Sequence, residues 1–574
     1  MIIKSLKCGL NSIGRASHSF RPQRAFLSQN RIFYQSKKSS LEHINFSTRA
    51  NFNSYFIGAA LFATGGFVSY GIFQGFDRKV KNDKSITKLN TLDPIKYGSL
   101  SDLKKAFQEI EQYLGPEFVT RADSEIENHT DSYYQTHHPL PGQRPKLIVY
   151  PKDTEQVSGV LKISHKYKVP IVPFSGGTSL EGQFIASRSG ITIDLNRLDK
   201  VLELNEDDLD VVVQPSVPWQ DLNEYLSPYG LMFGPDPGPG AQIGGMIGTS
   251  CSGTNAARYG TMKDNVLGLT VVLADGTIVK TKKRPRKSSA GYNLTGLFVG
   301  SEGTLGIVTE ATLKLHVKPE EETVAVINFD TIKDATNSVS SIVRKGIQVN
   351  AVEFLDSNMM KCINDVGSTS KTWLEKPTLM IKIGGSKSII KELVGTIKEI
   401  TTQNNSTRFQ FANDEEEKAE LWSARRFALW STIDWGKTHI DPNIKVYITD
   451  VAVPISKLSK VITETQDDIL ANGFNSTTIG HVGDGNFHAL VLYKDEESDK
   501  VKKLVGRMVD RAINNDGTCT GEHGVGVGKR EYLLKEVGED AVDTMRHIKL
   551  ALDPLRLLNP DKIFKIDPSD TNEH

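Results

Sequence analysis

The sequence predicts an α+β protein, on two observations. Residues 147–174 show the pattern of a short apolar strand, an amphipathic helix and a second strand. From residue 321 onward, strands and helices follow one another in the order β-α-β-β-α-β, which is the order of a ferredoxin-like module. At 574 residues the chain is too long for one ordinary hydrophobic core. We therefore expect two or three domains.

The composition argues against several kinds of protein. The 69 lysines and arginines balance the 69 aspartates and glutamates, so there is no net charge to attract nucleic acid. The cysteines at positions 8, 251, 362 and 519 are far apart and form no CxxC pair, which indicates neither a disulfide framework nor a cysteine zinc site. Any metal must therefore be held by histidine and carboxylate.

The first 50 residues have the composition of a mitochondrial presequence. Eight lysines and arginines precede the first acidic residue, Glu42, among many serines. A disordered basic tail is the alternative, although such tails are seldom so free of acidic residues.

Residues 55–73 are predicted to form a transmembrane anchor. This run holds about 19 uncharged, mainly apolar residues, just enough to span a bilayer. A buried helix is the alternative, but it would need a polar stripe, which the run lacks. A polar linker over residues 77–100 follows. This order predicts arrest in the mitochondrial inner membrane, with the rest of the chain in the intermembrane space.

The first folded part is expected over residues 101–320. We predict helices over 102–114 and 153–168, and strands over 147–150, 170–174, 191–195 and 210–214. Asp153 and Gln156 make a capping box at the start of the second helix. Residues 267–281 form a hairpin pattern whose Asp275-Gly276 turn suits a type I′ connection.

The second folded part is expected over residues 321–530. Its ferredoxin-like pattern consists of strands over 323–329, 348–355, 378–385 and 408–411 and helices over 331–345 and 386–402. A further α+β stretch extends to about residue 515. Residues 531–574 are expected to form a mainly helical C-terminal segment that returns to the first part.

Three glycine-rich segments, residues 175–179, 244–255 and 300–306, are candidates for binding a pyrophosphate. Such a group needs several backbone N–H groups at close range, which side chains would block. Any one segment alone is explained as well by structural turns. Other nucleotide folds are disfavoured, because no GxGxxG occurs and GVGVGKR places Arg530 where a Walker A motif needs serine or threonine.

Together and in this order, the three segments resemble the FAD-binding domain of the vanillyl-alcohol oxidase superfamily, the PCMH type. The resemblance covers about residues 140–320 and continues through an FAD-linked oxidase region to Phe564. It implies a two-subdomain FAD-binding domain followed by a substrate, or cap, domain. The residues that it implies for FAD binding are Pro173, Ser175, Gly176, Gly177, Thr178, Ser179, Pro235, Gly238, Gly244, Gly245, Thr249, Ser252, Gly253, Glu302, Gly303, Ile307 and Asn559. Relatives with covalent FAD have a histidine where this chain has Thr178, so non-covalent FAD is expected.

A second motif concerns a metal. IGHVGDGNFHALV places His481 and His488 seven residues apart across a Gly-Asp-Gly turn, and GEHGVG supplies Glu522 and His523 about forty residues later. Two imidazoles and a carboxylate suit Zn²⁺, Mn²⁺ or Fe²⁺ with positions left open for substrate. On the residues alone, structural histidines and a metal site are equally good readings.

These segments also resemble the D-2-hydroxy-acid dehydrogenase branch of the superfamily, which carries GHxGDGNxH and EHG. The resemblance implies that His481, His488 and Glu522 bind a divalent metal, most simply Zn²⁺, and that His523 is the general base. By the same register Arg425, in LWSARR, binds the substrate carboxylate. Arg426 is the neighbouring alternative, and a solvated helix face is the plain reading of both.

Two departures from relatives that oxidise D-2-hydroxyglutarate predict the substrate. Ile448 stands where those relatives have a lysine for the distal carboxylate, and Leu490 stands where they have an asparagine. An apolar pocket with one arginine suits a short monocarboxylate that carries a methyl group, lactate or 2-hydroxybutyrate, ahead of glycolate or D-2-hydroxyglutarate. The resemblance alone implies the D configuration, so oxidation of D-lactate to pyruvate is expected. Compartment and resemblance together imply cytochrome c as electron acceptor. An alkyl-dihydroxyacetone-phosphate synthase-like flavin transferase and an inactive membrane-bound binding protein are the alternatives, and the oligomeric state is open.

Overall fold

The computed structural model describes residues 84–133 and 135–571. The expected presequence and the expected anchor over residues 55–73 lie outside these ranges. Within the described ranges, no helix combines the length and the apolar character needed to cross a membrane.

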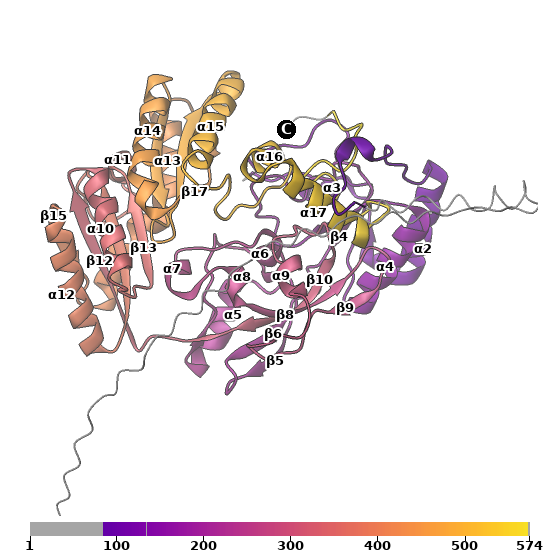
Figure 1. Ribbon diagram of the computed structural model, residues 1–574, viewed down its shortest axis with the longest axis horizontal. Helices are drawn as coiled ribbons and strands as arrows, with labels where there is room; N and C mark the ends of the chain where they lie inside the picture. Colours follow the sequence, from indigo (N-terminus) through magenta and orange to yellow (C-terminus); the bar gives the residue numbers. More distant parts are fainter. Residues whose placement is uncertain (1–83, 134, 572–574) are drawn as a thin grey trace, which may run out of the picture. The chain divides into compact units, whose positions relative to one another are not determined.

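The first part of the chain begins with a small sheet that contains the predicted strand–helix–strand unit (Figure 1). Its order is β1-β2-β4-β3, and β4 pairs in parallel with both β2 and β3. The elements are α2 (Leu100–Leu114), β1 (Val119–Thr120), α3 (Asp123–Asn128), β2 (Leu147–Val149), α4 (Thr154–Tyr167), β3 (Ile171–Phe174) and β4 (Ile191–Asp194). Asp153 caps α4 by accepting a hydrogen bond of 2.8 Å from the Gln156 N–H. The predicted strands and helices of this region are confirmed.

A second, antiparallel sheet follows in the order β5-β6-β10-β8-β9. Its strands are β5 (Val201–Asn205), β6 (Asp210–Val213), β8 (Val266–Val272), β9 (Ile278–Lys280) and β10 (Ile307–Lys314). The smaller elements around it are α5 (Trp219–Leu226), β7 (Leu231–Met232), α6 (Ile243–Thr249), α7 (Ala256–Tyr259), α8 (Met262–Asn265), α9 (Leu294–Phe298) and β11 (His316–Val317).

The β8–β9 hairpin is present, but the predicted turn type is wrong. A type I′ turn needs positive φ at both central residues, and Gly276 has φ +85° whereas Asp275 is not in that region. Five residues, 273–277, connect the strands, and the Leu273 N–H donates to the Thr277 carbonyl at 2.9 Å.

The next part, which we call the cap, is an eight-stranded sheet with helices on both faces. Seven strands follow the order β15-β12-β14-β13-β18-β19-β16, and β17 pairs with β19. The first four strands in sequence lie side by side in the order β15-β12-β14-β13 of a ferredoxin-like module, but the predicted β-α-β-β-α-β order is incomplete, because α11 lies between β13 and β14. The strands are β12 (Glu321–Phe329), β13 (Ala351–Leu355), β14 (Thr378–Gly385), β15 (Ser406–Phe411), β16 (Lys445–Ile448), β17 (Val451–Ala452), β18 (Asn475–Gly480) and β19 (Asn486–Tyr493). The helices are α10 (Ile332–Arg344), α11 (Ser357–Val366), α12 (Lys387–Gln403), α13 (Glu415–His439), α14 (Leu458–Ala471) and α15 (Ser498–Ile513).

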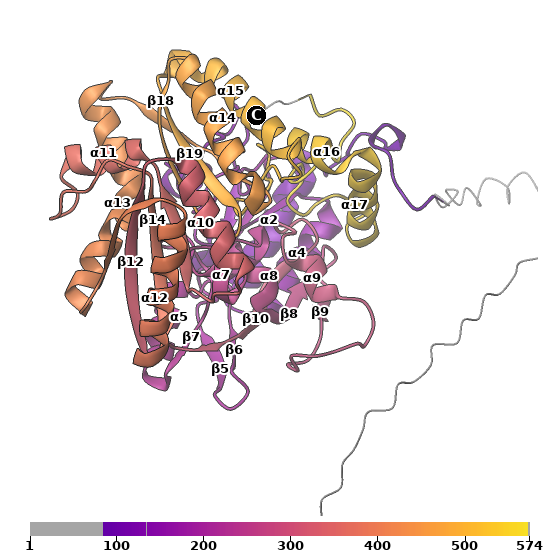
Figure 2. The same cartoon turned by 60° about the vertical axis from the view of Figure 1, so that its left-hand side comes forward.

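Strand alternation decides which cap residues reach the site. On β19, Phe487, Ala489 and Val491 pack into the core beneath α10, α12, α14 and α15. Figure 2 shows α10 and α12 along β12 and β14. His488 and Leu490 therefore lie on the opposite face, where Leu490 packs with residues of α11 and α13. This face of the sheet carries the site.

The C-terminal segment with α16 (Arg530–Val537) and α17 (Glu539–Leu552) contacts the first part of the chain. Leu558 forms a parallel bridge with Ile171 of β3, and the buried Lys549 ammonium donates to the Thr304 carbonyl at 2.6 Å. The described end of the expected linker is also ordered, which corrects that prediction. Thr87 is buried, and its N–H donates to the Asp543 carbonyl of α17.

Candidate functional site

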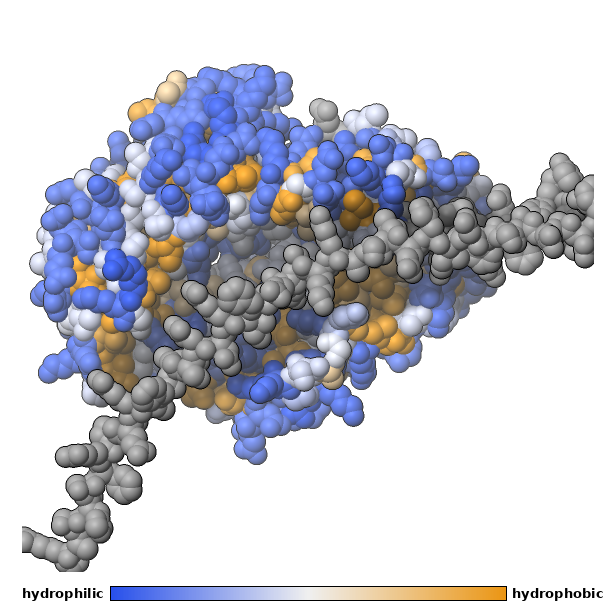
Figure 3. Space-filling view, in the orientation of Figure 1, coloured by the Kyte–Doolittle hydropathy of each residue, from blue (hydrophilic) through white to orange (hydrophobic). Residues whose placement is uncertain are grey.

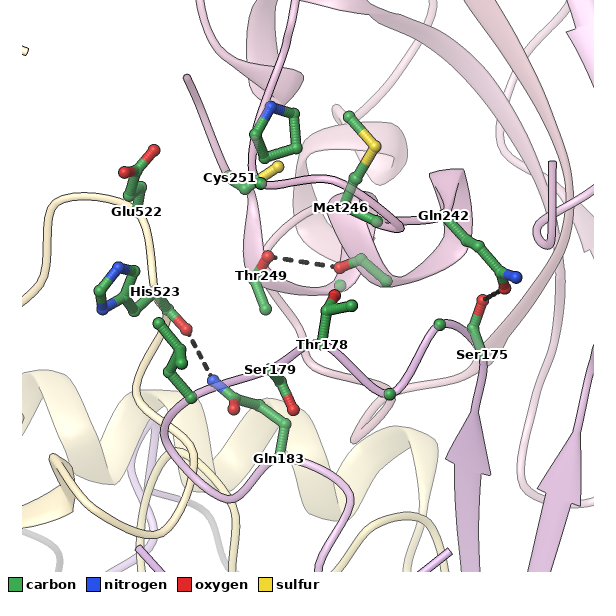
Figure 4. Close-up of a pocket in the computed structure, with 18 of the residues that line it drawn as sticks. Ser175, Thr178, Ser179, Gln183, Gln242, Met246, Thr249, Cys251, Glu522 and His523 are labelled. Atoms are coloured by element: carbon green, nitrogen blue, oxygen red, sulfur yellow. Dashed lines mark hydrogen bonds between the residues drawn. The ribbon is translucent and has the colours of Figure 1, made fainter. Parts of the chain in front are cut away.

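One cavity of about 520 Å³ joins the glycine-rich segments of the first part to the charged residues of the cap. Figure 3 shows a face of the molecule that is mainly hydrophilic around its rim. The hydrophobic residues on this face gather toward the middle of the view. Figure 4 shows the cavity from within, where Glu522 and His523 share one loop and face the segment that carries Thr249 and Cys251. This volume is in the usual range for small-molecule and cofactor sites.

The glycines that line the cavity are needed for two different reasons. Gly177 and Gly303 have φ of +65° and +68°, which other residues rarely adopt, and a Cβ on Gly303 would lie 2.4 Å from Pro173. A Cβ on Gly238 or Gly245 would meet no protein atom within 4 Å, so these backbones open onto the cavity. Backbone N–H groups can thus approach a ligand closely, as a pyrophosphate requires. The cradle fits FAD.

Most of the predicted FAD residues line this cavity. They are Pro173, Ser175, Gly176, Gly177, Thr178, Ser179, Gly238, Gly244, Gly245, Thr249, Glu302, Gly303, Ile307 and Asn559. Pro235, Ser252 and Gly253 are not among the residues that line it. Ser252 instead donates a 2.7 Å hydrogen bond to Glu522 Oε2, and Gly253 packs tightly against Asp236.

Glu302 and Asn559 also hold segments together. The Glu302 carboxylate accepts hydrogen bonds from the N–H groups of Val525 and Gly526 at 2.6 and 2.9 Å. Burial raises the pKa of Glu302 to about 7, although these two hydrogen bonds oppose the shift. The Asn559 amide donates to the carbonyls of Gln183 and Glu302. Both residues thus fix the C-terminal half of the chain against the glycine-rich segments.

The predicted metal ligands converge. His481 Nε2 lies 3.2 Å and His488 Nε2 3.3 Å from Glu522 Oε1. The other ring nitrogens face acceptors, since His481 Nδ1 lies 2.7 Å from the Glu353 carboxylate and His488 Nδ1 2.9 Å from the Thr449 carbonyl. Because these partners only accept, each Nδ1 carries a proton, and each Nε2 faces Glu522 Oε1, where it could offer its lone pair once a metal displaces any proton that it holds.

This donor set fits a divalent first-row metal. Donors bound to one ion at about 2.1 Å lie roughly 3.0–3.4 Å apart, and the two distances to Glu522 Oε1 are within that range. The outward hydrogen bonds from Nδ1 are the arrangement that orients metal-binding histidines. The residues also gather negative charge. Burial opposes ionisation of Glu522 and Glu353, but His481 holds the pKa of each carboxyl below its usual range.

Asp450 fixes the loop that carries Glu522 and His523. Its Oδ2 accepts hydrogen bonds from the backbone N–H groups of Gly521, Glu522 and His523 at 2.8 to 3.0 Å, and from the Thr520 hydroxyl. These donors give the buried carboxylate the partners that burial would otherwise deny it. His523 thereby faces the cavity, with its ring stacked on His488 at a centroid distance of 5.1 Å.

Arg425 and Arg426 of α13 both line the cavity. Arg425 Nε donates to Glu353 at 2.6 Å, so one carboxylate orients both this arginine and His481. The neighbouring wall is apolar. Ile448 and Leu490 are cross-strand partners on β16 and β19, and both line the cavity together with Ile479, Leu429 and Trp430.

Sequence reasoning missed Glu353, Asp450 and Glu181, whose carboxylates are buried at this site. A glutamate inside the apolar strand AVEFL was one available signal, and the aspartate directly before β17 was another. Glu181 lies two residues after the first glycine-rich segment. Each of the three contacts site residues that are distant in sequence. Glu353 and its partner His481, for example, are 128 residues apart.

Comparison with solved structures shows the fold, and the family models show the class of protein. The fold matches an alkyldihydroxyacetonephosphate synthase with a TM-score of 0.62 and 20% identity, over 85% of this chain and 92% of that one. Residues 145–282 match the FAD binding domain family, and residues 318–563 match the family described as FAD linked oxidases, C-terminal domain. The fold and the cavity are therefore those of an FAD-linked oxidase.

The sequence relatives narrow this class. The chain is 55% identical to the mitochondrial D-lactate dehydrogenase [cytochrome] of Kluyveromyces lactis, over 88% of this chain and 89% of that protein. It is 56% identical to D-lactate dehydrogenase [cytochrome] 1, mitochondrial, of Saccharomyces cerevisiae, over 86% and 85%. This chain belongs to the FAD-linked oxidase family that contains these D-lactate dehydrogenases.

Proposed function

We propose that this protein is an FAD-dependent dehydrogenase that oxidises D-lactate to pyruvate and passes the electrons to cytochrome c. One observation carries the proposal: a single cavity joins a glycine cradle, a histidine and carboxylate cluster, and an arginine. The named activity of relatives at 55 and 56% identity supports it.

The cofactors are assigned to two parts of the cavity. The glycine cradle holds FAD without a covalent bond, because Thr178 occupies the position of the attaching histidine, and bound FAD accepts two electrons from the substrate. His481, His488 and Glu522 hold a divalent metal, most simply Zn²⁺, with Mn²⁺ or Fe²⁺ as alternatives, and such an ion acts as a Lewis acid toward the substrate hydroxyl.

The side chains of the chain perform three tasks. Arg425 binds the substrate carboxylate through its free guanidinium edge, while Glu353 fixes the Nε edge. His523 lines the cavity and accepts the proton of the substrate hydroxyl. The wall formed with Ile448 and Leu490 contacts the methyl group and excludes water from that side.

The same wall sets the order of substrates. Glycolate lacks the methyl group and loses about 1–3 kcal/mol of discrimination in an apolar pocket. D-2-hydroxyglutarate would bring a second carboxylate against Ile448 and Leu490, where desolvation costs several kcal/mol. We expect kcat/KM to fall from D-lactate to glycolate to D-2-hydroxyglutarate, with L-lactate nearly inert. Anaerobic bleaching of the flavin by each acid tests this order, and faster bleaching by D-2-hydroxyglutarate or L-lactate would refute it.

The acceptor and the cellular location form the last part of the proposal. Reduction of purified cytochrome c by enzyme and D-lactate tests the acceptor, and a protein that reduces only an artificial dye would contradict it. The mitochondrial D-lactate dehydrogenases among the relatives support a mitochondrial location. We further propose a presequence over residues 1–50 and an inner-membrane anchor over 55–73. The anchor is followed by the FAD domain (101–320), the cap with the metal site (321–530) and the returning segment (531–574). In this proposed topology, all three lie in the intermembrane space. Protease protection of a C-terminal tag in mitoplasts would exclude that topology.

A further inference from the structure

Glu181 is a buried carboxylate just after the first glycine-rich segment, and the proposed reaction leaves it without a role. The residue is 2% exposed. Its Oε1 lies 3.1 Å from Lys529 Nζ and 3.7 Å from His523 Nδ1, and its Oε2 lies 3.3 Å from His137 Nε2. Three basic groups from distant segments thus surround one carboxylate.

The backbone of His523 is fixed from both sides of the cavity. Its N–H donates to Asp450 of the cap at 3.0 Å, and its carbonyl accepts a 2.7 Å hydrogen bond from Gln183. Among the described residues, His523 Nδ1 is a buried polar atom without a hydrogen-bond partner. The Glu181 carboxylate faces it at ion-pair distance, a separation that catalytic hydrogen bonds often show before substrate binds.

We propose that Glu181 is a positioning residue, which holds the His523 ring with Nδ1–H toward its carboxylate and so makes Nε2 the atom that takes the substrate proton. This inference rests on the proposed function. When the substrate reacts, its O–H bond breaks and an N–H bond forms at Nε2, while the electron pair of the Cα–H bond goes to bound FAD. The imidazolium that results carries a positive charge beside Glu181, which compensates it.

The surroundings keep Glu181 ionised for this task. Burial would raise the pKa of its carboxyl, but Lys529 and then His137 hold that pKa far below its usual range. The simpler reading is that Glu181 only fastens loops together, since its backbone carbonyl also accepts from the Val527 N–H at 2.9 Å. A fastening residue and a positioning residue predict different kinetics.

The test is anaerobic stopped-flow reduction of the FAD-loaded, full-length enzyme by D-lactate, compared among wild type, Glu181→Gln, Glu181→Asp and His137→Gln. Glu181→Gln keeps the shape and removes the charge. We expect roughly a 10²-fold lower limiting rate of reduction, an unchanged substrate concentration at half-saturation, and a larger solvent deuterium isotope effect. Glu181→Asp keeps the charge and should retain a rate between the two. His137→Gln keeps a hydrogen-bond donor for the other carboxylate oxygen, and Lys529 still holds Glu181 ionised, so this variant should reduce at nearly the wild-type rate.

Each outcome decides the question. A wild-type rate in Glu181→Gln would overturn the proposal, as would equal losses in Glu181→Gln and His137→Gln, which would indicate loop fastening. If Glu181→Gln fails to retain FAD, the test uses Glu181→Asp instead. A reduced rate in Glu181→Asp with a solvent isotope effect identical to that of the wild type would count against the proposal. If no 2-hydroxy acid bleaches the wild-type flavin, the proposed function itself fails.

Discussion

Glu353→Gln should weaken metal binding or substrate binding, because an amide cannot replace a carboxylate that accepts two hydrogen bonds from opposite sides. Glu353 Oε1 accepts from His481 Nδ1 at 2.7 Å, and Oε2 accepts from Arg425 Nε at 2.6 Å. Glutamine offers one oxygen and one NH₂ group. One of the two partners must therefore face a donor, or turn away.

The two possible arrangements have different consequences. If the NH₂ group faces His481, Nδ1 must accept and Nε2 must carry the proton, which removes its lone pair from the metal. Loss of such an orienting partner typically costs 10–100-fold in metal affinity, or about 1.4–2.8 kcal/mol. If the NH₂ group faces Arg425 instead, metal affinity is kept and KM for D-lactate rises.

Both quantities are measured on the same preparation. Metal content after dialysis against a graded chelator series gives the affinity, and steady-state kinetics gives KM, while the flavin absorbance confirms that FAD is bound. Glu321→Gln is the matched control, because this cap glutamate pairs only with the exposed Lys387, at 3.4 Å. Metal affinity and KM both equal to wild type in Glu353→Gln would refute the reasoning.

Three further predictions concern the ligands, the cradle and stability. His488→Ala should lose the metal and keep its FAD. The control His439→Ala, at the exposed end of α13, should lose neither. Full metal content in His488→Ala by elemental analysis would contradict the assignment. Gly245→Val should fold but purify with roughly 10-fold less FAD, because the new side chain meets no protein atom within 4 Å and enters the cavity. Gly395→Val is the control, since Gly395 is equally open but lies on the exposed surface of α12. Equal loss of FAD in both variants would count against the prediction. Burial raises the pKa of Asp356 from 3.8 to about 6, so the native state keeps a proton that the unfolded chain releases, and wild-type stability falls as pH rises between those values. Asp356→Asn lacks this loss, so its stability relative to wild type should rise by about 2 kcal/mol from pH 4 to 7, and a pH-independent difference in melting temperature would exclude the effect.

Local patterns were enough to predict most strands and helices, and tertiary contacts explain the errors. The apolar run of β12 and the Asp153 cap depend on neighbouring residues, so the sequence predicts both. The type of the β8–β9 turn could not be predicted in this way, because it depends on which residues close the loop. Here the Leu273 N–H donates to the Thr277 carbonyl. The described part of the predicted linker is polar, yet Thr87 is held by Arg546 and His547, about 460 residues away.

The site divides in the same way. The glycine segments and the His481, His488, Glu522 and His523 motifs are short runs with a recognisable spacing. The structure brings the glycine segments, His488, Glu522 and His523 to one cavity, and His481 contacts Glu522 from outside its lining. Glu353, Asp450 and Glu181 have no such spacing, because each acts on a residue that is distant in sequence. Ser252 was assigned to FAD by its place in a glycine segment, but the fold turns its hydroxyl toward Glu522.

The charges of the site connect the proposed metal with the proposed substrate. The buried Glu353 and Glu522 carboxylates carry two negative charges, and Arg425 carries one positive charge. A divalent cation at the His481, His488 and Glu522 donors would change the sum to one positive charge, which a single carboxylate neutralises. A second carboxylate on the substrate would leave an uncompensated charge beside the apolar Ile448 and Leu490. Among Glu353, Glu522 and Arg425, a metal dication and a monocarboxylate substrate thus leave no net charge.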